Sequence, residues 1–419
     1  MRSCYFLSKN VSRLTIFILA ALFVSLAAGG CATRGNPING FETERYAIIA
    51  KIAASADHSV ALDDEGGVWV AGLNKYGQLG LGDEFSRATF ARAKTLAGKK
   101  IVAIAAGYGN TFAVDDAGAL WAAGLNNFGQ LGAKDAKNKN SFVRAVNLAN
   151  RRILAVSAGV NHALALDDEG RVFAAGLNNF GQLGLGDAKD RDRFVQVAAF
   201  KNIKIAAIAT GYDHSFVIDE TGAAWASGWN GHGQLGLGDA KYRAKFARVG
   251  SLEGKKIVAI GAGDYHSVAI DAEGKAYAAG WSVHGQLGLG DKTKRLSFVE
   301  IDALRGKKIV AIGAGGFHTI AIDDRGKVWG AGFNGSGALG LGDRGDRQAF
   351  VEINSLNGEK IVAVAAGSDH SVVLNDKGAI AVCGWNYAGE MGLGEDRRNH
   401  FAVTFERPVF SEEQDAQTP

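Results

Sequence analysis

The chain has 419 residues with 46 Lys and Arg against 43 Asp and Glu, and its formal net charge is +3. Three of the basic residues and none of the acidic ones lie in residues 1–30, so the remainder carries 43 of each sign. This balance argues against a nucleic-acid-binding protein, which usually has a basic surplus or stripe, and only three cysteines argue against a disulfide framework.

The first 30 residues have the pattern of a secretory signal peptide: a basic start, an apolar stretch at 14–28 and small residues before Cys31. The apolar stretch is too short for a comfortable membrane span. Cys31 follows small residues as in a bacterial lipobox, so we expect cleavage before Cys31 and lipid attachment to its thiol. An ordinary cleaved signal with an incidental Cys, or a retained single-span anchor, are the alternatives. Residues 31–45 are polar with Gly and Pro and are predicted to be a tether.

A period of 52 residues organises the rest of the chain. A Gly-Gln-Leu-Gly phrase, varied in the last two copies, begins at residues 77, 129, 181, 233, 285, 337 and 389. A second phrase keeps the same interval at His58, Asn110, His162, His214, His266, His318 and His370. A fixed period of about 50 residues indicates identical supersecondary units that pack on one another.

The fifth unit illustrates the structure that each repeat predicts. Residues 256–262, 266–271, 276–280 and 297–301 are short β-rich runs separated by Gly-bearing turns, which predicts a four-stranded antiparallel sheet. Seven such sheets arranged radially cover each other's faces, whereas an open solenoid would need distinct polar end repeats. The sequence therefore predicts an all-β, seven-bladed β-propeller over residues 46–410, followed by an acidic, disordered tail at 411–419.

The small-small-Gly-x-x-His segments ending at His162, His266 and His370, with the Gly-Gln-Leu-Gly-x-Gly-Asp phrase, resemble the regulator of chromosome condensation repeat family. The resemblance covers the whole repeat region and implies a seven-bladed propeller. It also implies protein binding, as in secreted bacterial relatives that include a β-lactamase inhibitor. We do not expect the nucleotide exchange of the eukaryotic namesake, because the equal spacing leaves no inserted wedge to enter a GTPase.

The repeated polar residues are given structural roles. The six histidines are expected to be buried and to hydrogen-bond the turn of their own blade, with Asn110 bonding local backbone instead. Zinc is not expected, because equivalent residues of different blades are spread around a ring. Asp83 and its equivalents are expected to cap turns, because calcium needs several oxygen ligands. Cys383 is expected to be an inert core residue, and we predict no metal, no cofactor and no enzymatic activity.

The functional prediction depends on where the units differ. Loops after the first and third strands of each unit should emerge on one face, and their variable positions are rich in rings. The candidate binding residues are Tyr76, Tyr108, Phe128, Phe180, Tyr212, Trp229, His232, Tyr265, Trp281, His284, Phe317 and Tyr387. Aromatic residues on the loops of a rigid scaffold commonly anchor protein interfaces. The alternative is that Trp229, Trp281, Phe333 and Trp385 fill gaps between blades.

The sequence thus predicts a monomeric, lipid-anchored binding protein of the bacterial cell envelope, outside the cytoplasm. It would recognise a protein, or a glycan, through the aromatic face, and it would bind no nucleic acid. The alternative from another class is a periplasmic hydrolase or lyase at the mouth of the central channel, which carboxylates converging there from non-equivalent positions would favour. A purely structural scaffold without an exposed aromatic patch is the third alternative.

Overall fold

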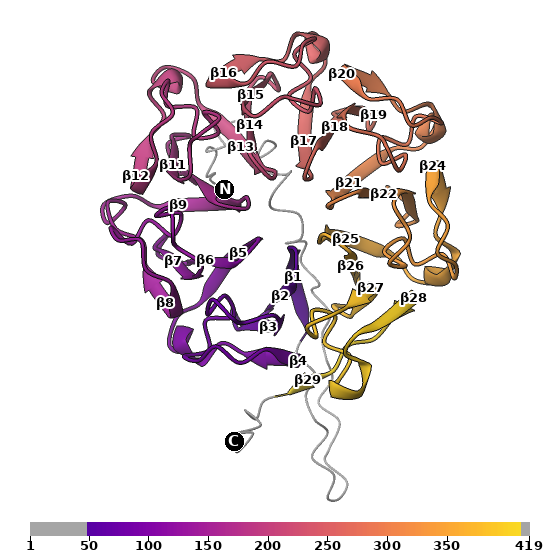
Figure 1. The fold of residues 1–419 in the computed structure, drawn as a ribbon, viewed down its shortest axis with the longest axis horizontal. Coiled ribbons are helices and arrows are strands. Elements are labelled where there is room, and N and C mark those ends of the chain that lie inside the picture. Colours follow the sequence, from indigo (N-terminus) through magenta and orange to yellow (C-terminus); the bar gives the residue numbers. More distant parts are fainter. Residues whose placement is uncertain (1–47, 412–419) are drawn as a thin grey trace, which may run out of the picture.

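The computed structural model describes residues 48–411, which form a closed ring of seven β-sheets around a central channel (Figure 1). The prediction of a seven-bladed β-propeller is confirmed. The predicted signal peptide, Cys31 and the tether lie outside the described residues, as do residues 412–419 of the predicted tail. Within residues 48–411, no helix is long and apolar enough to cross a membrane.

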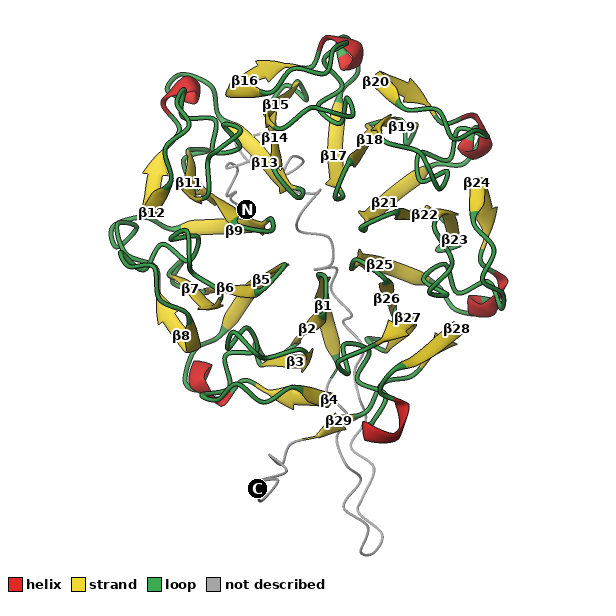
Figure 2. Cartoon of the chain, in the orientation of Figure 1, coloured by secondary structure: helices red, strands yellow, loops and turns green. Residues whose placement is uncertain are grey.

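Each blade consists of antiparallel strands that follow the chain from the channel to the periphery (Figure 2). Blades 1 to 4 contain β1 (Ile49–Ala54), β2 (His58–Asp63), β3 (Val68–Gly72), β4 (Arg87–Arg92), β5 (Ile101–Gly107), β6 (Asn110–Asp115), β7 (Leu120–Gly124), β8 (Lys139–Arg144), β9 (Ile153–Ala158), β10 (His162–Asp167), β11 (Val172–Gly176), β12 (Arg191–Gln196), β13 (Ile205–Thr210), β14 (His214–Asp219), β15 (Ala224–Gly228) and β16 (Arg243–Arg248).

Blades 5 to 7 contain β17 (Ile257–Ala262), β18 (His266–Asp271), β19 (Ala276–Gly280), β20 (Arg295–Glu300), β21 (Ile309–Ala314), β22 (His318–Asp323), β23 (Val328–Gly332), β24 (Arg347–Glu352), β25 (Ile361–Ala366), β26 (His370–Asn375), β27 (Ile380–Asn386) and β28 (His400–Glu406). Short 3-10 turns lie in the connections at η1 (Lys94–Leu96), η2 (Ala198–Phe200), η3 (Gly250–Leu252), η4 (Asp302–Leu304), η5 (Asn354–Leu356) and η6 (Glu395–Arg397). The strand β29 (Phe410–Ser411) follows the seventh blade.

The hydrophobic core lies between neighbouring blades. The second strand of every blade is buried along its whole length. Val60 and Leu79 of blade 1 share one cluster with Phe142 of blade 2, and equivalent clusters follow around the ring. The second Gly of the Gly-Gln-Leu-Gly phrase makes this contact possible: Gly80 has φ +64°, and a Cβ there would lie 2.3 Å from Phe142 Cε2.

The ring is closed by the C-terminal end of the propeller. β29 pairs in parallel with β4, and Phe410 lies opposite Phe90 with their rings stacked at 5.0 Å between centroids. Blade 1 therefore has five strands, one more than the four that the repeat predicts. Blade 7 also shares a buried cluster with blade 1, in which Ile49 and Phe90 pack with Met391.

The histidines of the repeat bond to the next blade and not, as predicted, to the turn of their own. His58 Nε2 lies 2.8 Å from Thr111 Oγ1 of blade 2. The equivalent pairs are His162–Ser215, His214–Ser267, His266–Thr319, His318–Ser371 and His370–Ser59. His58 alone keeps a bond of the predicted kind, because Ser55 Oγ lies 3.2 Å from its Nδ1. The histidines thus hold neighbouring blades together.

The exception at Asn110 also differs from the prediction. Neither side-chain polar atom of Asn110 has a hydrogen-bond partner among the described residues. The position that carries Ser or Thr in the partner blades is Ala163 here. Both halves of the inter-blade pair are therefore replaced at the interface of blades 2 and 3.

The aspartates of the long loops cap turns, as predicted. Asn74 Nδ2 donates to the Asp83 carbonyl oxygen at 3.0 Å, and Arg87 Nη2 donates to Asp83 Oδ2 at 2.7 Å. Cys383 is fully buried, and burial raises the pKa of its thiol. Residues 48–411 contain no group of three or more His, Cys, Asp or Glu placed to hold a metal ion.

Candidate binding face

Loops after the first and third strands lie on one face of the ring, as the sequence predicts. Tyr265 follows β17, the first strand of blade 5, and Trp281 follows β19, its third strand. The centroids of the two rings lie 5.5 Å apart. Loops from both positions therefore build one continuous surface, which we call the aromatic face.

Nine ring-bearing residues of blades 3 to 6 form a continuous chain of contacts on this face, with 4.8 to 6.3 Å between ring centroids. We call this set the aromatic cluster. Its members are Phe180, Tyr212, Trp229, His232, Tyr265, Trp281, His284, Phe317 and Phe333. Eight of them are among the predicted binding residues, and Phe333 is the addition.

The middle of the aromatic cluster is an interlocked group of rings. His232 stacks on Trp281 with 4.8 Å between centroids and an angle of 6° between planes, and its edge meets Trp229 at 5.1 Å. Burial lowers the pKa of His232, with the Lys294 charge as a second cause, and both favour the neutral imidazole. Trp229 and Trp281 are half-buried. They therefore pack against neighbouring rings and still keep an accessible side.

The cluster ends at blade 6 with a polar contact. His284 lies 5.0 Å from the ring of Phe333, and its Nδ1 is 2.9 Å from Asp346 Oδ2. Asp346 also accepts a hydrogen bond from the backbone N–H of Asn334. The position of the His284 ring is thus fixed by both a packing and a hydrogen-bond partner.

Four of the predicted binding residues lie outside the aromatic cluster. Tyr108 is 42% exposed and lines the channel mouth. Tyr76 lies beneath the ammonium of Lys75, 4.8 Å from it, and Phe128 is exposed. Tyr387 is exposed beside Trp385 in blade 7.

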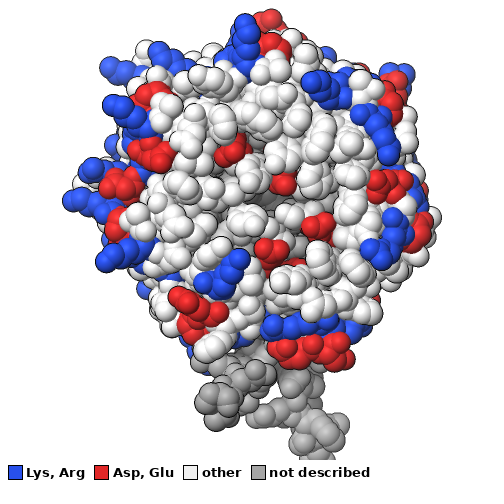
Figure 3. All heavy atoms as spheres, viewed as in Figure 1, with Lys and Arg blue, Asp and Glu red and all other residues white. Residues whose placement is uncertain are grey.

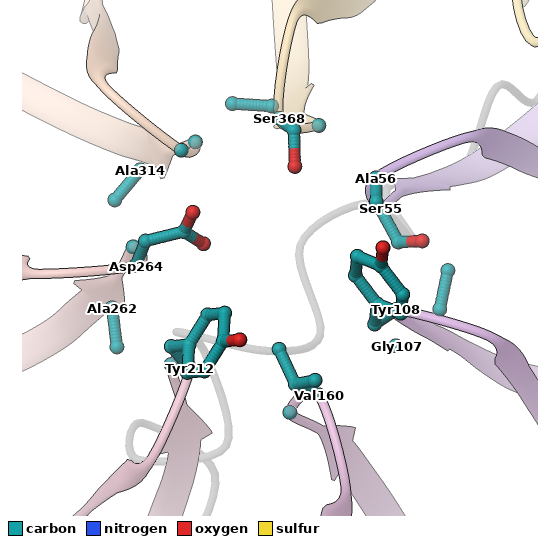
Figure 4. Close-up of a pocket in the computed structure, with 18 of the residues that line it drawn as sticks. Ser55, Ala56, Gly107, Tyr108, Val160, Tyr212, Ala262, Asp264, Ala314 and Ser368 are labelled. Carbon is teal, nitrogen blue, oxygen red and sulfur yellow. The ribbon is translucent and has the colours of Figure 1, made fainter.

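The mouth of the central channel on this face is a cavity of about 120 Å³ lined by the loops after the first strands. Figure 4 shows Asp264, Tyr108, Tyr212 and Ser368 around it, with the Asp264 carboxylate directed into the opening. Among residues 48–411, Asp264 is the only acidic residue in the lining, and no Lys, Arg or His of that range lines it. Figure 3 shows acidic residues near the centre of this face, while most basic residues lie toward its periphery.

Asp264 at the mouth and two further acidic residues, Asp213 and Glu390, have raised pKa values. Burial, followed by the charge of Asp369, raises the pKa of Asp264 to about 7. Burial raises the pKa of Asp213 to about 6, although Gln182 donates a hydrogen bond to it. Burial and the Asp57 charge raise the pKa of Glu390 to about 7. Sequence reasoning missed these residues because it considered only aromatic side chains among the positions that vary.

The sequence did contain a signal for the acidic group. The two positions before the repeated His vary from blade to blade and carry Asp57, Asp213, Asp264 and Asp369. Glu390 stands where five other blades carry Gln, and it accepts hydrogen bonds from the backbone N–H groups of Tyr387 and Ala388. Only the ring geometry shows which of these residues act on one another, since Asp369 acts on Asp264 and Asp57 acts on Glu390.

The other end of the channel opens into a wider cavity of about 850 Å³. Its lining combines apolar residues of the first strands with both charges at the rim, including Lys51, Lys308, Asp271 and Asp323. Because both Lys and Asp residues line this end of the channel, neither sign of charge predominates there.

Comparisons with known families match most of the repeat region. The family described as RCC1-like domain matches residues 31–253, and the regulator of chromosome condensation (RCC1) repeat matches residues 273–322 and 325–374. The ultraviolet-B receptor UVR8 of Arabidopsis thaliana is 33% identical over 356 residues, which is 85% of this chain and 81% of UVR8. The human E3 ubiquitin-protein ligase HERC2 is 27% identical over 343 residues, 81% of this chain but only 7% of HERC2.

Two solved structures have the same fold. Human WBSCR16 superposes with a TM-score of 0.73 at 23% identity, covering 81% of this chain and 93% of that one. Prp20p of Saccharomyces cerevisiae gives 0.69 at 24% identity, covering 78% and 82%. The Prp20p structure was described together with its binding to Gsp1p and histones. At these identities the likeness shows the shared architecture.

Proposed function

Because this chain belongs to the RCC1-like domain family, we propose that it is a binding protein that recognises a protein partner through the aromatic cluster. The single observation that carries the proposal is the run of nine contacting rings on the loops of blades 3 to 6, where the repeats differ in sequence. Prp20p, a protein of the same fold, is described as binding the proteins Gsp1p and histones, which agrees with this use of the propeller.

The packing of the cluster favours binding with little reorganisation. Trp229, Trp281 and Tyr265 are held by edge contacts at 5.5 Å on loops of a rigid ring. Aromatic anchors that are already fixed lose little conformational entropy when a partner docks. The stacking of His232 on Trp281 covers one face of each ring, so the cluster presents edges as well as faces. A protein surface of mixed shape fits this relief better than the flat ring of a sugar.

We also propose that the protein is tethered to a bacterial envelope membrane by a lipid on Cys31. This proposal rests on the sequence of residues 1–31. Growth with a clickable palmitate analogue should label the wild-type protein, and Cys31→Ala should abolish the label. A Cys31→Ala protein that is still labelled and still sediments with membranes would contradict the anchor.

One observation favours the alternative of a hydrolase or lyase at the channel mouth. Asp264 and Asp369 come from non-equivalent repeat positions, and the Asp369 charge contributes to the raised pKa of Asp264. The cavity of about 120 Å³, however, holds one group of side-chain size. A glycosidic or ester bond needs room on both sides of the reacting atoms. The space available therefore favours binding over bond cleavage.

The binding proposal is tested by removing accessible rings from the cluster. The Phe180→Ser, Tyr212→Ser double variant should reduce capture of crosslinked partners from envelope extracts by at least tenfold, because interface energy concentrates in a few aromatic anchors. The matched control is Phe85→Ser, Tyr242→Ser, which removes two rings that are 76% and 60% exposed and lie outside the cluster. Equal capture by the two variants and wild type, with unchanged melting temperatures, would reject the aromatic cluster as the binding surface.

A further inference from the structure

We propose that the channel mouth on the aromatic face receives one positively charged side chain, a lysine or arginine of the protein partner. The inference rests on the proposed function, because it names the group that the partner presents at the centre of the same face. The argument starts from Asp264, the carboxylate that points into the cavity (Figure 4).

The carboxylate of Asp264 has no cationic partner among the described residues. In the part of the chain that the structure describes, no Lys, Arg or His lines the cavity, and the Asp264 carboxylate makes no hydrogen bond or ion pair. A buried charge without a partner is unfavourable, and its raised pKa reflects that cost. A cationic group that enters the cavity would supply the missing partner and displace the bound proton.

Two tyrosines give the cavity a second property suited to a cation. Tyr212 lines the opening beside Asp264, and Tyr108 lines it on the opposite side (Figure 4). Tyr212 also stacks on Tyr265 with 5.6 Å between centroids, so the cavity is continuous with the aromatic cluster. Aromatic faces attract ammonium and guanidinium groups. A partner seated on the cluster is therefore positioned to place a cationic side chain in the mouth.

The surroundings strengthen the negative potential. Asp57, Asp213 and Asp369 occupy the position before the repeated His in blades 1, 4 and 7. Lys75 is the basic residue that acts on Asp57, and its ammonium lies over the ring of Tyr76. Acidic residues thus predominate near the centre of the face, and the basic residues lie mainly toward its periphery (Figure 3).

Other occupants fit the same cavity less well. Calcium takes six to eight oxygen ligands, and the cavity offers a single carboxylate in its lining. An anion would face Asp264 without a compensating base. A second copy of this chain, docked coaxially through the same face, would bring the two acidic centres together. The volume of about 120 Å³ is enough for the end of one cationic side chain.

The first experiment uses small probes on the purified full chain. n-Butylammonium and methylguanidinium, which mimic the ends of Lys and Arg, are titrated at pH 8 and constant ionic strength while the shifts of ¹³C-labelled tyrosine rings are followed. We expect saturable shifts at Tyr108 and Tyr212, at least fivefold weaker binding in Asp264→Asn, and unchanged binding in the control Asp116→Asn, which alters an exposed hairpin acid. The tighter of the two probes identifies the partner's residue type.

The neutral analogue 1-pentanol and a pH change complete the test. We expect no saturable shift with 1-pentanol and weaker binding of both cations at pH 5.5, where Asp264 holds a proton. Equal shifts with 1-pentanol, or an Asp264→Asn protein that binds both cations like wild type, would overturn the inference. Asp264→Asn removes an unfavourable buried charge, so at pH 8 it should melt at or above the wild-type temperature.

Partner capture separates this inference from the proposed function. Loss of capture in both Asp264→Asn and the single variant Phe180→Ser, which leaves Tyr212 at the mouth in place, supports both. Loss in Phe180→Ser with full capture by Asp264→Asn overturns the cationic anchor and leaves the aromatic binding surface standing. Full capture by both variants overturns both proposals.

Discussion

At the scale of single residues, the repeated histidine acts across the blade interface. The hydroxyl of Thr111 donates to the Gln78 carbonyl oxygen at 2.7 Å, so it must accept from His58 Nε2–H. Because burial lowers the pKa of His58 to about 4, the histidine is neutral at pH 7, and its one ring proton lies on Nε2. The sequence showed that these histidines were structural, but it could not show their partners, because the pairs are formed between adjacent blades.

Asn110 and Ala163 allow this role to be tested by adding the missing pair. Gly107 leaves space beside Asn110, as Gly159 does beside His162. Asn110→His alone should be neutral or destabilising, because the new Nε2–H would face the methyl group of Ala163. Combined with Ala163→Ser, it should gain a coupling free energy of about 1 kcal/mol, the usual net value of a hydrogen bond. Urea unfolding of the two single variants and the double variant measures this coupling, and additive effects would show that no inter-blade bond forms.

At the scale of strands and loops, the 52-residue period predicted the blades well. Each repeat contains the strand and turn patterns of one blade, in the order in which the chain forms them. The strand runs, the Gly-bearing turns and the Asp-capped loops all lie where the pattern places them. The element that the period could not predict is β29, because it occurs once and pairs with β4 about 320 residues earlier. Its two residues have no counterpart in the other units.

We expect β29 to contribute measurably to ring closure through Phe410. The Phe410 ring stacks on Phe90 at 5.0 Å and meets the edge of Trp69 at 5.4 Å. Phe410→Ala should lower the free energy of unfolding by about 2 kcal/mol, less than for a fully buried Phe because this ring is half-buried. Phe85→Ala, at a 76% exposed ring, should change it by less than about 0.5 kcal/mol. Equal effects of the two substitutions in chemical denaturation would mean that β29 does not help to close the ring.

At the scale of the whole molecule, ring closure decides which residues meet. The sequence identified eight members of the aromatic cluster because each stands at a variable loop position. It could not tell that Tyr76 and Tyr387 would lie apart from that cluster while Tyr265 would touch Trp229 and Trp281. Asp264 was missed because only aromatic side chains were considered among the variable positions, and its place at the channel mouth appears only after seven units close into a ring.

The ring also buries two kinds of ionisable group, histidines and carboxyl groups, whose titration changes the stability of the fold in opposite directions. Burial lowers the pKa of His58 and His318 to about 4, and of the other four repeat histidines to about 3. Between these values and the ordinary 6.5 the unfolded chain binds more protons, so stability is lost as pH falls through this range. Asp264 and Glu390, raised to about 7, act oppositely, because the folded state holds their protons and stability falls as pH rises from about 4 to 7.

Six histidines outnumber the carboxyl groups with raised pKa values, so we expect net acid destabilisation below pH 6.5. His266→Asn removes one titrating group, and the stability of this variant should depend less steeply on pH between 4.5 and 6, by about 1.4 kcal/mol per pH unit. Asp264→Asn should steepen the dependence, because it removes an opposing group. Urea unfolding at several pH values measures both slopes. If His266→Asn left the slope unchanged, the folded protein would already carry a second ring proton at these pH values, and the buried histidine would not be neutral; its Nε2–H could still donate to Thr319.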